Sequence, residues 1–254
     1  KDDKEASIAQ LITLKRSSVE GKCAVFHIAN HNTELKDYAG VVEADALQEP
    51  TAIELFYDKR KYWAKAIDDV VKVQMAADLM LPEVNAIGHQ IKKELETAVF
   101  KAAKAEAEAE VIGTSDEDLY DVIVNMGVKL DEANVPAEGR YVIVSPAMMA
   151  KLQKDTRVLA YHGAPIMANG ISQIEVDGMI VVKSNNAEIG DNIICIQKDA
   201  IALGVQIDKM ESYRSQDAFA DVVRGLIVYG LAVVRPANIV KGSIIGNEGE
   251  NAGP

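Results

Sequence analysis

The side chains best able to do chemistry in this sequence are its histidines, cysteines and acidic clusters. His27 and His31 stand four residues apart, which suits two metal ligands on one face of a helix, but their surroundings are typical of strand and loop. His162 precedes Gly163 in an irregular stretch with no cysteine or acidic cluster beside it. We therefore interpret these histidines as packed or solvated side chains and predict no metal-binding residue.

Two acidic clusters have an electrostatic explanation that needs no catalysis. Asp116, Glu117 and Asp118 lie near the start of a predicted helix, where the helix dipole favours negative charge. A second cluster, at positions 106, 108 and 110 (all Glu), falls on the solvated end of another predicted helix. The dinucleotide, P-loop, zincin and hydrolase patterns GxGxxG, GxxxxGKS/T, HExxH and GxSxG are missing. We predict no catalytic residue, no cofactor-binding residue and no cofactor.

Composition limits the classes of partner. The net charge of −12 and the pI near 4.9 disfavour a nucleic-acid-binding surface, because that affinity comes chiefly from Lys and Arg. The longest apolar run, Leu226 to Val234, is interrupted by Gly230 and is too short to cross a membrane, so no membrane partner is expected. Cys23 and Cys195 form no CxxC pair and lie in apolar stretches, which predicts buried packing thiols in a reducing compartment.

One long helix is the main predicted element, from Leu81 to Glu110. Its apolar residues recur at steps of three and four, which indicates a single buried stripe, and Pro82 suits the first turn. At about 1.5 Å per residue the helix would be roughly 45 Å long, comparable to a whole domain. Such a helix either lies across a surface and packs against a further partner, or is an ordinary surface helix. The stripe consists of Val84, Ile87, Ile91, Leu95, Ala98, Ala102, Ala105 and Ala109.

The residues before this helix predict an arm and a projecting hairpin. Lys1 to Arg16 carry a short amphipathic pattern without a partner nearby in sequence. Gly21 to Ile28 and Thr51 to Tyr57 favour strand, and a long polar connection, Ala29 to Pro50, joins them. An isolated hairpin is at best marginally stable in water, so it should lie on another surface; an irregular loop folded over its own domain is the alternative.

The remaining chain predicts a compact α/β unit followed by long strands. A helix over 119–130, preceded by the capping-box spacing of Thr114 and Glu117, should be followed by a buried strand and by a helix capped by Ser145 and opened by Pro146. The segment from Thr156 to Gly178 is expected to be irregular. The predicted strands are Lys61–Lys65, Tyr141–Val144, Met179–Lys183, Asn192–Gln197, Ala200–Ile207 and the system Asp221–Arg235, closed by Pro236.

Several local phrases in this order resemble one family, the major capsid proteins of tailed bacteriophages, whose fold is shared with herpesvirus capsids and encapsulins. The resemblance covers residues 51 to about 240. The phrases are Ala133–Pro146 (ANVPAEGRYVIVSP), Val182–Asn186 (VKSNN), Lys198–Leu203 (KDAIAL), Glu211–Arg214 (ESYR), Ala218–Leu226 (AFADVVRGL), Tyr229–Gly230 (YG) and Val234–Pro236 (VRP).

The resemblance implies an α+β fold with an N-terminal arm, an extended β-hairpin loop, a peripheral domain on a long spine helix and an axial α/β domain. We assign residues 1–20 to the arm and 21–57 to the loop. The expected peripheral domain is 58–112 with 208–241, the axial domain is 113–207, and the C-terminal tail is 242–254.

The resemblance also implies a function. We expect a structural protein, not an enzyme, that self-assembles as pentamers and hexamers into the icosahedral head enclosing double-stranded DNA. It would assemble in the host cytoplasm and reside in the virion, with scaffolding, portal or cementing proteins as further partners. The negative charge fits a container wall that contacts packaged DNA weakly. Some capsids of this fold form Lys to Asn isopeptide links, for which Lys36 is a candidate donor, but no motif singles it out and we favour non-covalent packing.

Two alternatives stay open from the sequence. A bacterial nanocompartment shell resembling encapsulins would have the same fold and would differ in holding protein cargo instead of nucleic acid. A soluble α/β enzyme or ligand-binding domain centred on Gly113 to Ile207 would run as a monomer or small oligomer.

Overall fold

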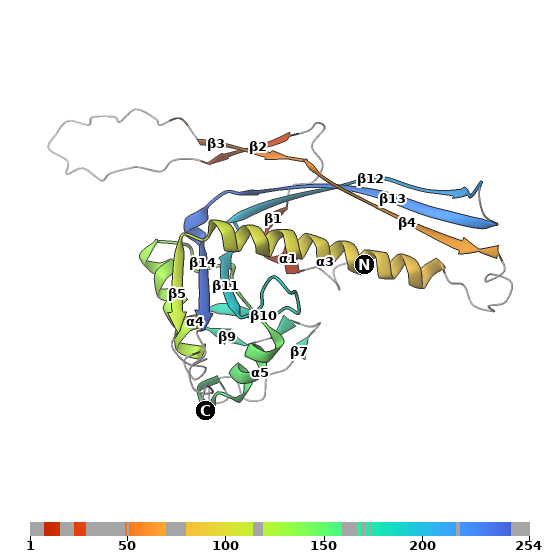
Figure 1. Ribbon diagram of the computed structural model, residues 1–254. Coiled ribbons are helices and arrows are strands. Elements are labelled where there is room, and N and C mark those ends of the chain that lie inside the picture. The colour runs from red at the N-terminus through yellow and green to blue at the C-terminus, as the bar shows by residue number, and fades with distance from the viewer. Residues whose placement is uncertain are drawn as a thin grey trace, which may run out of the picture.

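Two sheets and one long helix organise the molecule. The computed structural model describes residues 8–15, 23–28, 49, 51–69, 80–113, 119–158, 167–168, 171–172, 174–216 and 219–244. Helix α3, Met80–Glu106, runs between a four-stranded sheet on one side and a six-stranded sheet on the other (Figure 1). A separate two-stranded ribbon lies beyond the four-stranded sheet.

The six-stranded sheet is mixed and has the order β5-β14-β11-β6-β10-β9. Strand β6 pairs in parallel with β10 and antiparallel with β11, and β14 pairs antiparallel with β11 and in parallel with β5. Helices α4, Leu119–Glu132, and α5, Pro146–Lys154, pack on it. The strands are β5 Ala109–Gly113, β6 Arg140–Val144, β9 Glu175–Val176, β10 Met179–Lys183, β11 Asn192–Gln197 and β14 Ile239–Ile244.

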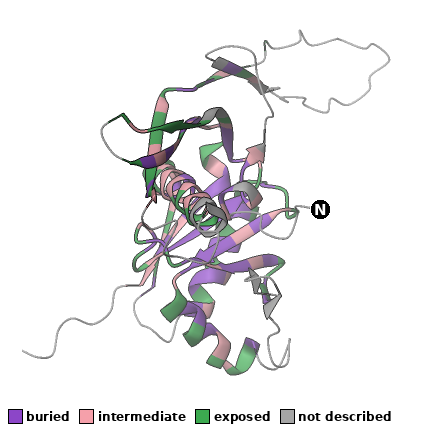
Figure 2. Ribbon diagram, turned by 90° about the vertical axis from the view of Figure 1, so that its right-hand side faces the viewer, coloured by how far each residue is buried: buried purple, intermediate pink, exposed green. Residues whose placement is uncertain are grey.

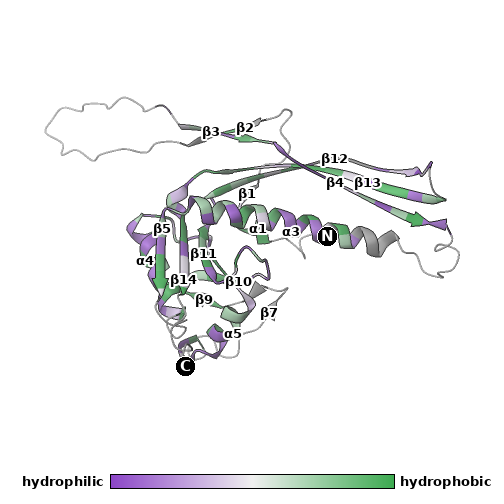
Figure 3. Cartoon of the chain, in the orientation of Figure 1, coloured by the Kyte–Doolittle hydropathy of each residue, from purple (hydrophilic) through white to green (hydrophobic). Residues whose placement is uncertain are grey.

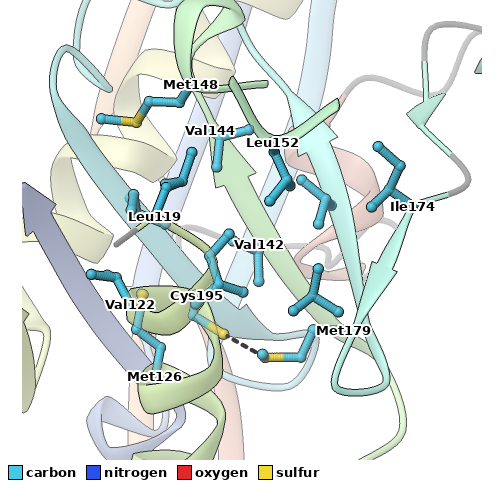
Figure 4. Packing of buried hydrophobic residues seen from close by; sticks show 14 of the residues in the cluster. Leu119, Val122, Met126, Val142, Val144, Met148, Leu152, Ile174, Met179 and Cys195 are labelled. Carbon is cyan, nitrogen blue, oxygen red and sulfur yellow. Dashed lines mark hydrogen bonds between the residues drawn. The ribbon is translucent and has the colours of Figure 1, made fainter. Parts of the chain in front are cut away.

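This sheet is buried on both faces, which explains its near-continuous apolar strands. In β6, Val142 and Val144 point into one cluster, whereas Ile143 between them belongs to another. The first cluster lies under α4 and α5 (Figure 4), and the second lies under α3. Buried residues accordingly concentrate around this sheet in Figure 2.

The four-stranded sheet is long and has the order β1-β12-β13-β4. Strands β12, Ile201–Arg214, and β13, Ala220–Val233, form an antiparallel ladder with an irregularity between Ile207 and Lys209. Strand β4, Lys59–Asp68, pairs along the other side of β13. Hydrophobic residues continue along β13, whereas the outer half of β12 is hydrophilic (Figure 3), and α3 packs against this sheet near its junction with the rest of the molecule.

The N-terminal segment is built into the core. Helix α1, Ile8–Leu11, packs on α3, and β1, Leu14–Lys15, pairs in parallel with β12. Ala9, Ile12 and Thr13 are completely buried. The described part of the predicted arm is therefore held by its own chain through residues far away in sequence.

Helix α3 ends earlier than predicted, and its buried side differs. The helix stops at Glu106, and residues 109–113 form β5, because β14 offers them a strand partner and the Ala/Glu alternation also has a period of two. Leu95 is buried as predicted, but Val99, Phe100 and Ala103 complete the buried side. Ala98 and Ala102 are only half-buried and Ala105 is exposed, because larger apolar side chains are available for the core.

Several other predicted elements are confirmed. Strands β10 and β11 have the predicted bounds, while β6 and α4 differ from theirs by at most two residues. The side chain of Ser145 caps α5 by accepting a hydrogen bond from the backbone N–H of Met148 at 3.4 Å, and Pro146 is its first residue. The capping box at Thr114 and Glu117 lies outside the described residues. The segment predicted to be irregular contains the short strands β7 Met167–Ala168, β8 Ile171–Ser172 and β9.

The C-terminal region contains a strand that the sequence pattern did not predict. Pro236 opens a 3₁₀ turn, η3 Pro236–Asn238, after which β14 enters the six-stranded sheet. The sequence pattern does not predict this strand because it contains Gly242, and glycine is unfavourable within strands. The structure explains the glycine, since a Cβ at this position would meet the Sδ of Met126. Residues 109–112 of β5 and 239–241 of β14 lie in the range expected to be peripheral, but they join the sheet of the region expected to be axial. Conversely, residues 201–207 of β12 lie in the range expected to be axial, but they pair with β13 in the sheet expected to be peripheral.

Candidate assembly surfaces

The structure describes few of the residues singled out for possible chemistry. His31, Lys36, His162 and Asp116–Asp118 lie outside the described residues, and His27 lies in β2. Glu110 belongs to β5 and forms an ion pair with Lys241 of β14 at 2.9 Å, so it is not part of a helix end. Within the described ranges, no three His, Cys, Asp or Glu side chains gather to hold a metal ion.

Cys195 is a buried packing thiol, as predicted. Its Sγ lies 3.4 Å from the Sδ of Met179 in the cluster under α4 and α5 (Figure 4). Burial raises the pKa of this thiol to about 12, so the reactive thiolate is strongly disfavoured. The backbone of Cys23 lies in β2 opposite Phe56, and the structure does not describe its side chain, so the predicted burial of this thiol stays a prediction.

The two-stranded ribbon is the first surface with an unusual exposure pattern. Strands β2, Cys23–Ile28, and β3, Thr51–Phe56, pair antiparallel as predicted. One side of the ribbon packs on its own four-stranded sheet, with Leu55 and Ala24 buried among residues of β12 and the end of β13. The other side leaves Val25 and Phe56 exposed.

Glycines make the close approach of the ribbon possible. A Cβ on Gly230 of β13 would clash with the carbonyl oxygen of Phe56, and one on Gly204 of β12 would meet the ring of Tyr57. The base of the projection is therefore anchored on its own chain: the strands form as predicted, and they lie on their own domain, as in the alternative left open by the sequence. The polar connection of residues 29–50, apart from Glu49, lies outside the described residues.

The free end of the four-stranded sheet is the second surface. Arg214 of β12 pairs there with Asp69 and Asp221, which ties β12 to the end of β4 and the start of β13. Nearby, Arg224 pairs with Glu211 and stacks on the ring of Tyr213, 4.8 Å from its centroid. Phe219 is 81% exposed at this end. A side chain this apolar and this exposed favours contact with another surface.

A groove between α3 and the four-stranded sheet is the third surface. Its volume is about 270 Å³, and apolar and aromatic side chains from α3, β4 and β13 form most of its lining. Glu94 lies at one side, where it accepts a hydrogen bond from the hydroxyl of Tyr229 at 3.2 Å and pairs with Lys61 at 3.1 Å. Burial and the Glu94 carboxylate raise the pKa of Tyr229 to about 12. The hydroxyl of Tyr229 therefore stays neutral and hydrogen-bonded beside the apolar groove.

The α4–α5 corner carries a further ion-pair cluster. Arg157 pairs with Asp121 at 2.7 Å and with Asp155 at 2.9 Å, and it lies over the ring of Tyr120. Its hydrogen bonds lower the pKa of Asp155. These contacts hold α4 against the end of α5, so the cluster is explained as a structural link between the two helices.

In the described residues, no helix is long and apolar enough to span a lipid bilayer.

Solved structures resemble this chain over most of its length. A chain from Mycobacterium phage Che8 is 26% identical, with a TM-score of 0.70, over 88% of this chain and 85% of that chain. The capsid structure of cyanophage P-SCSP1u gives 18% identity and a TM-score of 0.76, over 95% and 89% of the two chains. A virus-like particle from Pyrococcus furiosus gives 15% identity and 0.61, over 94% and 92%.

No protein-family model and no curated protein matches the chain. The fold is nevertheless similar over 85% or more of each chain compared with the Che8 and P-SCSP1u structures.

Proposed function

We propose that this chain, which has the fold of the major capsid proteins of tailed bacteriophages, is itself a structural major capsid protein that assembles with copies of itself into a phage head. The observation that carries the proposal is the match to capsid structures over nearly the full length of both chains, 95% and 89% for cyanophage P-SCSP1u. These relatives are capsids and not enzymes, which supports a structural role.

The parts of the fold then take assembly roles. We assign the four-stranded sheet with α3 to the peripheral domain, and α4, α5 and the six-stranded sheet to the axial domain. Residues 21–57 form the extended loop and 1–20 the N-terminal arm. The pairing of β5 and β14 supports moving residues 109–113 and 239–244 to the axial side of the division expected from the sequence.

The proposed product is an icosahedral shell of pentamers and hexamers around double-stranded DNA, assembled in the host cytoplasm. The net charge of −12 supports weak contact with that DNA, because like charges repel across the inner wall. Scaffolding, portal and cementing proteins are proposed as further partners by the family resemblance alone.

A nanocompartment shell is the second candidate. The observation that favours it is the similarity to the virus-like particle from Pyrococcus furiosus, over 94% of this chain. The two candidates predict the same shell and different contents, since one encloses nucleic acid and the other protein.

The test is to express the chain, size the native product by light scattering and image it by electron microscopy. We expect closed particles of megadalton mass. A product that is only monomer or dimer under all assembly conditions would contradict the proposal. Nuclease-protected DNA in particles from the natural source would favour the phage head, whereas a protein cargo without DNA would favour the nanocompartment.

A further inference from the structure

The groove between α3 and the four-stranded sheet has the size and lining of a site for one large apolar side chain. Its volume of about 270 Å³ lies near the lower end of the range for ligand pockets, roughly 300–1,000 Å³. Gln90 and the Lys61–Glu94 ion pair add polar groups to it. The apolar lining consists of Tyr62, Trp63, Ile87, Ile91, Leu95, Ile227 and Tyr229.

The same molecule presents a matching group at the free end of the sheet. Phe219 is 81% exposed, but its backbone is fixed, because its carbonyl oxygen accepts a hydrogen bond from the N–H of Asp69 at 2.9 Å. The Ser215 N–H donates to the carbonyl oxygen of Ala220 at 2.9 Å on the other side of the turn. Because the backbone at Phe219 is already fixed, only the few rotamers of an aromatic side chain need to be ordered on binding, which favours its use as an anchor.

Phe219 is too far away to fill the groove of its own chain. It precedes Ala220, which pairs with Asp68 at the end of β4, whereas Trp63 in the groove pairs with Gly225. Five residues of strand separate Asp68 from Trp63, a distance of about 17 Å at ~3.4 Å per residue. Phe219 can therefore fill this groove only in another copy of the chain.

The charges on β4 favour such a contact between two copies. Lys59 and Lys61 lie on one side of β4 and place positive charge beside the groove, where Glu94 pairs with Lys61 and Lys59 lies over the ring of Tyr229. At the Phe219 end, the acidic residues Asp68, Asp69, Glu211 and Asp221 outnumber the basic residues Arg214 and Arg224. Placing the acidic end of one copy on the basic part of another joins opposite charges, whereas joining two like ends would oppose equal charges.

We propose that the groove receives the Phe219 end of a second copy of this chain. The inference rests on the proposed self-assembly and identifies one contact within it. The two surfaces are different patches of the molecule, so the contact is heterologous and can repeat from copy to copy around a ring or across a shell.

The contact can be tested by cross-linking between differently labelled chains. In a Cys23→Ser background, one protein carries Phe219→Cys and the other carries Gln90→Cys, a substitution of an exposed residue of the groove. After co-assembly and mild oxidation, we expect a disulfide-linked heterodimer on a non-reducing gel. The matched control replaces Gln90→Cys by Val128→Cys, an exposed position on α4, and should give no heterodimer.

The outcomes separate this inference from the proposed function. Shells that form by electron microscopy without the heterodimer would overturn the inference and leave the proposed function intact. A Gln90→Cys thiol that is unreactive in unassembled subunits would also overturn it, because the groove would then be closed by its own chain.

A second variant measures the strength of the contact. Phe219→Ala should raise the protein concentration needed for assembly about tenfold or more and should leave subunit unfolding unchanged, since the side chain is exposed. Val128→Ala, a truncation of another exposed apolar residue, should change the assembly threshold less than about twofold. Equal effects of the two variants would contradict a specific anchor at Phe219.

Discussion

Ala103 and Ala105 lie two residues apart on α3 in opposite environments. Ala103 is 1% exposed in the cluster shared by α3 and both sheets, whereas Ala105 faces solvent. The chemical type of these two residues is the same, so only the helix orientation separates them.

This pair gives a direct test of the buried side of α3. Ala103→Asp places an unpaired carboxylate in the core and should lower the free energy of unfolding by about 3 kcal/mol or more. Ala105→Asp makes the same change at the surface and should cost less than about 1 kcal/mol. Chemical denaturation of the two purified variants measures both values. A larger loss of stability for Ala105→Asp than for Ala103→Asp would contradict the assignment of the buried side of α3.

Glu96 joins α3 to the N-terminal segment under unfavourable electrostatic conditions. Its Oε1 accepts a hydrogen bond from the N–H of Ile8 at 3.1 Å, but burial raises the pKa of this carboxyl, and that effect outweighs the hydrogen bond and the nearby Lys92. The folded protein therefore holds this proton more tightly than the unfolded chain does. The Glu96 carboxyl therefore contributes most to stability below the ordinary carboxyl pKa, and this contribution is lost as the pH rises through the raised pKa of the folded protein.

Replacing this carboxyl removes the pH-dependent cost. Glu96→Gln keeps an oxygen acceptor for Ile8 and should unfold at a higher temperature than the parent at pH 7. The difference should shrink towards about pH 4, where the carboxyl of the parent is also largely protonated. Glu106→Gln, at the exposed end of the same helix, is the matched control for the loss of one carboxylate from α3. A Glu96→Gln effect that is equal at both pH values would show that ionisation is not its cause.

At the scale of elements, glycines decide where strands approach each other. Gly230 allows the backbone of β13 to lie against the ribbon at Phe56, whereas a methyl group added at Gly88 of α3 would meet nothing within 4 Å. The first glycine is required by a contact between elements, and the second only weakens its own helix.

The two glycines therefore predict opposite results for one substitution. Gly230→Ala should destabilise the protein by about 1–3 kcal/mol, because the new methyl group displaces the ribbon. Gly88→Ala should stabilise it by about 0.5–1 kcal/mol through helix propensity and a less flexible unfolded chain. Thermal unfolding of both variants beside the parent provides the measurement. Destabilisation by Gly88→Ala would indicate that the space beside this glycine is filled.

At the scale of the whole molecule, we expect the proposed extended loop, residues 21–57, to serve assembly more than folding. The core contains both sheets and α3, and the ribbon is anchored at its base by Leu55 and Tyr57. The connection between the ribbon strands is rich in polar residues and lies mostly outside the described part of the chain, so our expectation for it rests on its composition.

Replacing residues 29–50 by a short Gly/Ser link should leave the unfolding transition of the body nearly unchanged, because loop length affects closure entropy only slowly. Complete shells should no longer form. Thermal unfolding and electron microscopy of the same shortened protein test both statements. Much earlier unfolding would assign the loop to the core, and intact shells would exclude it from assembly.

The sequence by itself determined the elements whose signals are local. Alternation and apolar runs located β10 and β11, and Ser145 with Pro146 marked the start of α5, because capping depends on residues within one turn. The order of short phrases around these elements also indicated the capsid fold, which the solved structures confirm.

Only the tertiary structure decided which partners these elements have. The change from helix to strand after Glu106 depends on β14, more than a hundred residues later, and the Glu110–Lys241 pair joins the same two segments. The buried side of α3, the anchoring of the ribbon over Gly230 and the groove facing β4 depend likewise on distant residues. Local periodicity shows which residues of an element are apolar. Which of them are buried, and against what, depends on how all the apolar side chains of the chain pack together into one core.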